Sequence, residues 1–225
     1  PRMQLLKPYP QYAAAATANA YGGSLNSLRP PVGDSIYHAV TFRAERRFSR
    51  GLSLQAHFTI SKLLDIGGVG NGNAFNDTSA LRDIYNIRLE RSVSAWDVPQ
   101  RLVVNYSYEL PFRGRLLGGW TILGFHVLES GRPIAVGGPD LSRLAGASPS
   151  RANVVAGQDP RIPYEQAVAN ARNFNPICAC TPAWFNTRAF AEAPEFTIPN
   201  GPRFLPNVRQ DWTRNWDVSV TKRVK

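Results

Sequence analysis

The chain has only two cysteines and one methionine in 225 residues. Cys178 and Cys180 are too few for a disulfide scaffold, and they lack the second pair of ligands that a structural zinc site needs. We expect a local disulfide or two unreactive thiols there. No apolar run reaches the roughly 18 residues of a transmembrane helix, and segment 1–12 has no signal-peptide pattern. These absences argue against a disulfide-rich secreted domain and against a helical membrane protein.

Acidic residues are also scarce, since 16 Asp and Glu stand against 26 Lys and Arg and the formal net charge is +10. Clustered basic residues would suit nucleic acid, because they neutralise phosphates. Here they are dispersed, and no basic run is longer than a pair such as Arg46-Arg47 or Lys222-Arg223. We therefore expect no nucleic-acid partner. The surplus charge instead suits anionic lipid head groups, including those of lipopolysaccharide, or an anionic solute.

The chain is rich in turn formers and aromatic residues, with 18 Gly, 18 Pro, 11 Phe, 8 Tyr and 5 Trp. This composition is typical of strands and loops, and the best helical candidate is a short one over 164–173. The clearest alternation of apolar and polar residues runs over 52–61. Its apolar positions are Leu52, Leu54, Ala56, Phe58 and Ile60.

The alternation predicts about five strands. Segment 35–62 is expected to form a hairpin with a turn at 49–51, and segment 97–136 a second hairpin with a turn at 111–118. In the first turn Gly51 is able to take a positive φ. Segment 212–225 is expected to form the fifth strand. The stretch 120–136 is apolar on both sides for part of its length, so the pattern does not assign its two faces.

The predicted connections differ sharply in length. Residues 1–34, 63–96 and 137–211 are expected to be loops, whereas the two turns are short. Bacterial outer-membrane barrels have this organisation, with short periplasmic turns, long extracellular loops and strands of about ten alternating residues. Aromatic residues near both ends of the strands fit two interfacial girdles. The sequence therefore predicts an all-β fold, made of antiparallel strands of a partial transmembrane barrel, in the outer membrane of a Gram-negative bacterium.

Several phrases of the sequence together resemble a known family. They are "LLKPYPQY" at 5–12, "SIYHAVTFRAERRFSRGLSLQAHFTISKLLD" at 35–65, "DVPQRLVVNYSYELPF" at 97–112, "LLGGWTILGFHVLESGRPIAV" at 116–136, "WFNTRAF" at 184–190 and "NWDVSVTKRV" at 215–224. They resemble the C-terminal barrel region of TonB-dependent outer-membrane transporters of the Oar-like kind. The resemblance implies a barrel of about 22 strands, plugged by an N-terminal domain and energised through TonB.

This sequence departs from that pattern, because it holds about five strands and no plug, TonB-contact segment or signal peptide. An open sheet leaves two unpaired edges in hydrocarbon, which the bilayer does not tolerate. We therefore expect a part of a longer transporter that takes up an unidentified solute and meets the TonB complex through its missing N-terminal region. A soluble or surface-attached β-sandwich that binds carbohydrate or protein is the alternative, but a sandwich predicts similar short loops at both ends.

Polar residues of the strands are expected to line the lumen, where opposite charges pair across the inner wall and with the plug. These residues are Arg43, Glu45, Arg47, Gln55, Arg101, Asn105, Glu109, Asp217 and Arg223. Recognition of the solute is expected in the extracellular loops, because binding residues concentrate in loops. The aromatic candidates there are Trp184, Phe185 and Phe190.

No motif for catalysis or metal binding emerges from the chain. His38, His57 and His126 have no metal-ligand spacing, and no serine lies in a Gly-x-Ser-x-Gly elbow. The glycine-rich stretch 67–73 lacks the Lys and the helix of a phosphate-binding loop, and its Asn and Asp neighbours lack the spacing of a calcium loop. We expect no enzyme activity, no cofactor and no metal.

Overall fold

The computed structural model describes residues 33–66, 82–83, 86–114, 118–139, 151–173 and 183–223. The chain divides into two compact units. The sheet unit comprises residues 36–63, 96–132 and 209–225. The loop unit comprises residues 1–35, 64–95 and 133–208.

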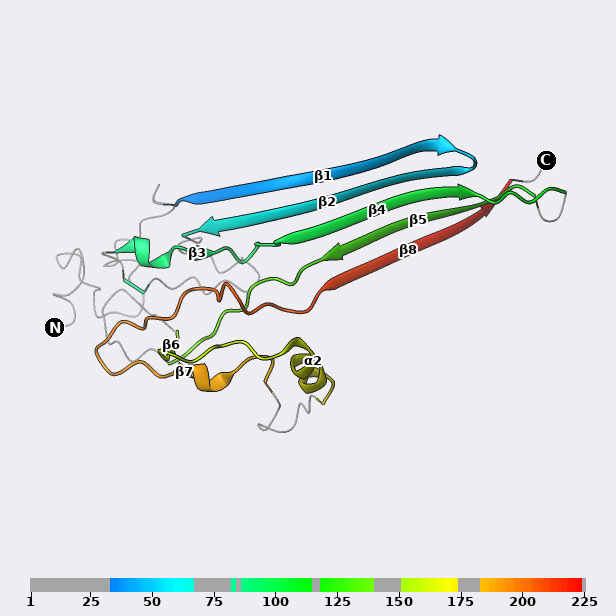
Figure 1. The fold of residues 1–225 in the computed structure, drawn as a ribbon. Helices are drawn as coiled ribbons and strands as arrows, with labels where there is room; N and C mark the ends of the chain where they lie inside the picture. Colours follow the sequence, from blue (N-terminus) through cyan, green and yellow to red (C-terminus); the bar gives the residue numbers. More distant parts are fainter. Residues whose placement is uncertain are drawn as a thin grey trace, which may run out of the picture. The chain divides into compact units, whose positions relative to one another are not determined.

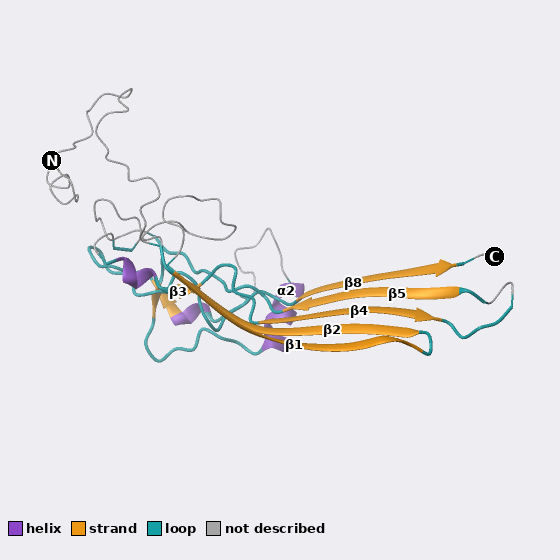
Figure 2. Cartoon of the chain, turned by 90° about the horizontal axis from the view of Figure 1, so that it is seen from above, coloured by secondary structure: helices purple, strands orange, loops and turns teal. Residues whose placement is uncertain are grey.

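Five long antiparallel strands form the sheet, in the order β1-β2-β4-β5-β8 (Figure 1). They are β1 (Ser35–Ser49), β2 (Leu52–Asp65), β4 (Gln100–Glu109), β5 (Trp120–Glu129) and β8 (Thr213–Lys222). Figure 2 shows the same strands side by side from above. Among the described residues the sheet is open, with β1 and β8 at its edges. The predicted fold class, antiparallel strands of a partial barrel, is confirmed.

The turn between β1 and β2 consists of Arg50 and Gly51, which both have positive φ, at 52° and 80°. Two central residues with positive φ characterise a type I′ turn, whose twist matches that of the flanking strands. Gly51 also lies close to β4, since a Cβ at this position would be 2.8 Å from the backbone oxygen of Glu109. The positive φ expected at Gly51 is therefore present, and the neighbouring strand leaves no room for a side chain.

Strand pairing gives the sheet two distinct faces. Leu54 pairs with Tyr106, Tyr106 with Gly124, and Gly124 with Val218, so even-numbered residues of these four strands share one face. The apolar face comprises Leu52, Leu54, Ala56, Phe58, Ile60, Leu102, Val104, Tyr106, Tyr108, Trp120, Ile122, Gly124, His126, Leu128, Trp216, Val218 and Val220. Three polar residues at the strand ends, Gln100, Arg214 and Lys222, lie on the same face. The polar face comprises Ser53, Gln55, His57, Thr59, Arg101, Val103, Asn105, Ser107, Glu109, Thr121, Leu123, Phe125, Val127, Glu129, Thr213, Asn215, Asp217, Ser219 and Thr221.

The register thus assigns the faces of β5, which alternation alone left open. The strand is also shorter than the apolar stretch 120–136 suggested, because it ends at Glu129. Just beyond it the chain approaches another segment closely, and a Cβ at Gly131 would lie 1.8 Å from the backbone oxygen of Gln210. Pro133 then lacks the N–H that a strand ladder needs. Apolar composition continues past the strand, but strand geometry does not.

An aromatic group on the apolar face spans β4, β5 and β8. A Cβ at Gly124 would lie 2.3 Å from the ring of Tyr106, so the ring occupies the space over the glycine. The ring of His126 lies 5.4 Å from that of Tyr106 and 4.4 Å from that of Trp216, measured between centroids. Three adjacent strands are therefore joined by side chains as well as by their backbones.

Replacing Gly124 by Val is expected to displace the ring of Tyr106 and to destabilise the folded barrel by roughly 1–3 kcal/mol, as overpacking does. The measurement is the urea midpoint at which the full-length protein loses its heat-modifiable mobility in gels. Tyr106→Ala removes the ring that the new side chain would meet. We therefore expect Gly124→Val to destabilise the Tyr106→Ala variant less than it destabilises the protein that retains Tyr106. Equal effects of the substitution in both backgrounds would contradict this role of Tyr106.

Short elements occur within the loop unit. They are the 3-10 helices η1 (Ile87–Glu90) and η2 (Thr187–Ala189), the strands β3 (Ser92–Val93), β6 (Asn153–Val154) and β7 (Phe190–Ala191), and the helix α2 (Tyr164–Arg172). The helix predicted over 164–173 is therefore present as α2. No helix of the described residues has the length and apolar character needed to cross a membrane.

The apolar core of the loop unit is small. Val93, Ala95 and Phe204 are buried together, with Leu64 and Ala135 packed against them. Buried ion pairs supplement this core. Their members are Arg82, Glu90 and Arg151 in one group and Arg203 and Asp65 in another. The segments predicted as long loops thus contain compact structure, with both apolar contacts and buried ion pairs.

Burial lowers the pKa of the Arg203 guanidinium from its usual value to about 10. A group with that pKa still carries its charge at neutral pH, and the carboxylate of Asp65 meets that charge. The pair therefore remains ionic under physiological conditions.

Candidate functional site on the polar face

Opposite charges meet at several points of the polar face and of β1. Arg101 contacts Glu129 on the neighbouring strand, with 2.7 Å between Nε and Oε1. On β1, Glu45 lies 2.7 Å from Arg43 and 3.8 Å from Arg47. The sequence suggested Arg101 as a charged wall residue but did not single out Glu129, because only strand pairing places the two residues opposite each other.

The other residues expected in the lumen lie elsewhere on the sheet unit. Asp217 of β8 accepts a hydrogen bond of 2.8 Å from the side-chain amide of Asn215. Asn105 lies in the middle of β4, between Gln55 of β2 and Phe125 of β5. Glu109 ends β4, and Arg223 follows β8. The predicted residues therefore do not form one cluster but extend along the whole face.

A polar hollow of about 300 Å³ lies over β1, β2 and β4. Its lining is Glu45, Ser53, Leu54, Gln55, Asn105, Tyr106 and Ser107. Within the described part of the chain, no side-chain hydrogen bond joins Ser53, Gln55, Asn105 or Ser107 to another residue. Each of these side chains can both donate and accept. The hollow therefore offers a concentrated set of available hydrogen-bonding groups.

Beside this hollow the polar face carries an apolar patch, formed by Val103, Leu123, Phe125 and Val127. Phe125 is 43% exposed although it belongs to a polar surface. It directly faces Asn105 on β4 and Asp217 on β8. Sequence reasoning missed Phe125 because the stretch around it is apolar on both sides, and no local signal separates its two faces.

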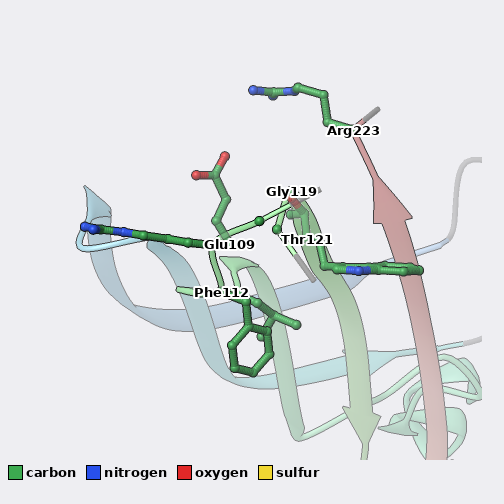
Figure 3. A pocket seen from close by; sticks show the side chains of 10 residues that line it. Glu109, Phe112, Gly119, Thr121 and Arg223 are labelled. Atoms are coloured by element: carbon green, nitrogen blue, oxygen red, sulfur yellow. The ribbon is translucent and has the colours of Figure 1, made fainter. Parts of the chain in front are cut away.

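A second cavity, the turn-end hollow, lies where β4, β5 and β8 reach the short turn, and it measures about 600 Å³. It is lined by Glu109, Leu110, Phe112, Arg113, Gly114, Gly118, Gly119, Trp120, Thr121 and Arg223. Figure 3 shows Glu109 and Arg223 extending to one side of the ribbon and Phe112 to the other. The backbone N–H of Arg223 donates to the oxygen of Gly119 at 2.9 Å, which holds the end of β8 against β5. Groups of both charge signs thus border this hollow.

The aromatic residues predicted for recognition form two pairs in the loop unit. Phe185 and Phe190 meet edge to face at 5.5 Å between centroids, so they cover part of each other. Trp184 instead meets Tyr164 of α2 at 6.5 Å. Tyr164 is 50% exposed, and no local signal in the sequence singled it out. Of the four aromatic side chains in these two pairs, Tyr164 is the exposed one, whereas the other three are partly buried.

An ion pair precedes α2 in the same unit. Arg161 donates side-chain and backbone hydrogen bonds to Asp159, and these bonds lower the pKa of that carboxyl to about 2. The side-chain amide of Asn186 donates to the backbone oxygen of Asp159 at 2.9 Å. The segment before α2 is thereby attached to the segment that carries Trp184 and Phe185.

The described residues contain no group of three or more His, Cys, Asp and Glu side chains that could hold a metal. His126 lies on the apolar face, 3.4 Å from the hydroxyl of Tyr106, and His57 lies on the polar face, so the histidines do not converge. Cys178, Cys180 and the glycine-rich stretch 67–73, with its neighbouring Asn and Asp residues, lie outside the described residues.

An antiparallel sheet with one apolar face, one polar face and connections of very unequal length has the characteristics of an outer-membrane barrel wall. A family model described as "Outer membrane beta barrel domain" matches residues 1–225, so the chain belongs to that family. The protein is accordingly located in the outer membrane, and the β-sandwich alternative is set aside. No curated protein and no solved structure matches the chain.

Proposed function

We propose that the chain is part of the barrel of a TonB-dependent transporter of the Oar-like kind, which takes up a solute through a plugged lumen. The observation that carries the proposal is the continuous pair of faces across β2, β4, β5 and β8. A polar inner face suits a lumen that contains water and a plug, and an apolar outer face suits lipid. The strand phrases that resemble this transporter family support the finer assignment.

In this proposal the apolar face meets hydrocarbon and lipopolysaccharide. Exposed side chains such as Trp216 and Val218 suit that solvent, since they are 70% and 57% exposed. The open edges at β1 and β8 pair with further strands of the same barrel, because unpaired backbone groups are costly in a bilayer. The loop unit is extracellular, and Trp184 with Tyr164 contributes to capture of the solute. The TonB complex acts through a region N-terminal to this barrel.

An immunoblot of fractionated native cells tests the proposal, with an antibody raised against residues 140–200. We expect a heat-modifiable band in the outer-membrane fraction, far above the 24.9 kDa mass of the chain. Formaldehyde cross-linking in the same cells is expected to join this protein to TonB, and the adduct is expected to disappear in a strain without TonB. A soluble band near 24.9 kDa, or a large outer-membrane protein that never cross-links to TonB, would contradict the proposal.

A further inference from the structure

Three side chains with different chemistry share one row of the polar face. Gln55 pairs with Asn105, and Asn105 pairs with Phe125 on the next strand. Directly paired residues on one face have Cβ atoms about 5 Å apart. The row therefore places two carboxamides and one phenyl ring along a span of about 10 Å.

Among the residues that the structure describes, neither carboxamide of this row has a side-chain hydrogen-bond partner. As described above, Gln55 and Asn105 border the polar hollow together with Ser53 and Ser107, and their side chains make no hydrogen bond within the described residues. Amides and hydroxyls donate as well as accept, so they match a ligand that does both. A dense set of hydroxyl groups has this property.

Phe125 adds an apolar platform at the end of the row. Its exposed ring, with Leu123 and Val127 on either side along the strand, lies on a face whose paired residues on β2 and β8 are polar. Covering apolar surface is favourable by about 25 cal/mol for each Å² removed from water. A ligand with an apolar side and a polar rim therefore gains from Phe125 and from the amides together.

Most charged groups near the row already have partners. Glu45 contacts Arg43 and Arg47, Arg101 contacts Glu129, and the carboxylate of Asp217 accepts a hydrogen bond from the neutral amide of Asn215. An ionic ligand would have to compete with these contacts, whereas a neutral one leaves them intact. The charge distribution at the row thus favours an uncharged solute, even though the whole chain carries a net charge of +10.

We propose that Gln55, Asn105 and Phe125, with Ser53 and Ser107, form a subsite in the lumen for a neutral carbohydrate. The hydroxyl rim of a sugar ring bonds to the two carboxamides, and its C–H face packs on the phenyl ring of Phe125. This inference rests on the proposed transport function and names the class of solute that passes along the wall.

Calorimetric titration of the purified full-length protein in detergent tests the subsite. The probes are three neutral hexasaccharides (maltohexaose, cellohexaose and mannohexaose), the anionic hexagalacturonate and the uncharged peptide hexaglycine. We expect binding of at least one neutral hexasaccharide. Phe125→Ala is expected to weaken it roughly 5- to 10-fold, by loss of aromatic packing, and Asn105→Ala roughly 3- to 10-fold, by loss of a hydrogen bond.

Two further variants separate binding from folding. Phe125→Trp retains an aromatic platform and is expected to retain binding. Phe42 is 60% exposed on β1, and its neighbour Thr41 contacts Thr59 of the polar face, so Phe42 lies on the opposite face. Phe42→Ala therefore removes a matched aromatic side chain and is expected to leave binding unchanged. Each variant must show heat-modifiable mobility before titration, so that a misfolded protein is not scored.

The inference is overturned if no neutral hexasaccharide binds, if only hexagalacturonate or hexaglycine binds, or if Phe125→Ala binds as tightly as the parent protein. Cross-linking of the same variants to TonB distinguishes this failure from failure of the proposed function. A protein that binds none of the sugars but still cross-links to TonB remains a transporter with a different solute.

Discussion

Replacing Glu90 by Gln is expected to destabilise the loop unit by about 3–5 kcal/mol, the usual cost of removing one partner from a buried ion pair. Glu90 is only 1% exposed and lies between two buried arginines. Its carboxylate accepts from Nη2 of Arg151 at 2.5 Å and from the backbone N–H of Arg82 at 2.8 Å. Glutamine preserves the shape of the side chain but removes the negative charge that both guanidinium groups face.

Glu90→Gln leaves the two buried guanidinium groups of Arg82 and Arg151 without the carboxylate of Glu90. Burial lowers the pKa of Arg82, and the charge of Glu90 opposes that effect. Without Glu90 the desolvation of Arg82 is uncompensated, and the neighbouring charge of Arg151 adds repulsion. Opening of the segments to water is then the favourable response, because water solvates both guanidinium groups.

Hydrogen exchange of the full-length protein in detergent measures the effect of Glu90→Gln. We expect faster exchange of the amides of residues 86–95 and 151–155, with little change in β4 and β5. The control is Glu45→Gln, which removes a carboxylate from an exposed pair with Arg43 and is expected to cost no more than about 1 kcal/mol. Unchanged protection of residues 86–95 would show that the buried group does not hold the loop unit together.

Replacing Asp97 by Ala is expected to destabilise the sheet unit, again by about 3–5 kcal/mol. Asp97 is fully buried, and it accepts from the backbone N–H of Leu63 and from Nη2 of Arg209, each at 2.6 Å. Arg209 also donates to the backbone oxygens of Asp97 and Gly131. The pair of Asp97 and Arg209 thus connects the end of β2 with the segments that enter β4, leave β5 and enter β8.

The readout for Asp97→Ala is the urea midpoint of heat-modifiable mobility in the full-length protein, and we expect it to fall strongly. A double-mutant cycle with Arg209→Met isolates the pair, because the double variant leaves no buried charge unpaired. It is expected to be more stable than Asp97→Ala alone. The matched control is Asp159→Ala, whose ion pair with Arg161 is exposed and whose loss should leave the midpoint unchanged. Additive effects of Asp97→Ala and Arg209→Met would refute the coupling.

Alternation along the chain was sufficient to predict the class of fold. Apolar and polar residues alternate over residues 52–61 of β2, and this alternation can be recognised without knowing which strand lies alongside. The turn at Gly51 was predictable for the same reason, because positive φ depends on the residue itself. The difference in length between the short and the long connections could be predicted from the spacing of these strands along the chain.

Pairing between strands was needed for β5 and for the candidate site. Leu123, Phe125 and Val127 alternate with residues that are equally apolar, so their face depends on the register with β4 and β8. The same register brings Phe125 beside Asn105 and Glu129 beside Arg101. Neither pair has a signature in the sequence, since any residue on one strand can lie opposite any residue on the next until the turn and the packing set the register.

Contacts between distant segments were the least predictable part of the molecule. Glu90 and Arg151 are 61 positions apart, and Asp97 and Arg209 are 112 positions apart. Along the chain these side chains resemble ordinary surface charges, and they are buried only because the long connections fold back on themselves. The chain's residue pattern therefore specified an antiparallel sheet of an outer-membrane barrel, with one apolar and one polar face. Its folding in space selected which charges are buried and which side chains line the polar hollow, because burial and pairing depend on neighbours that the local sequence does not contain.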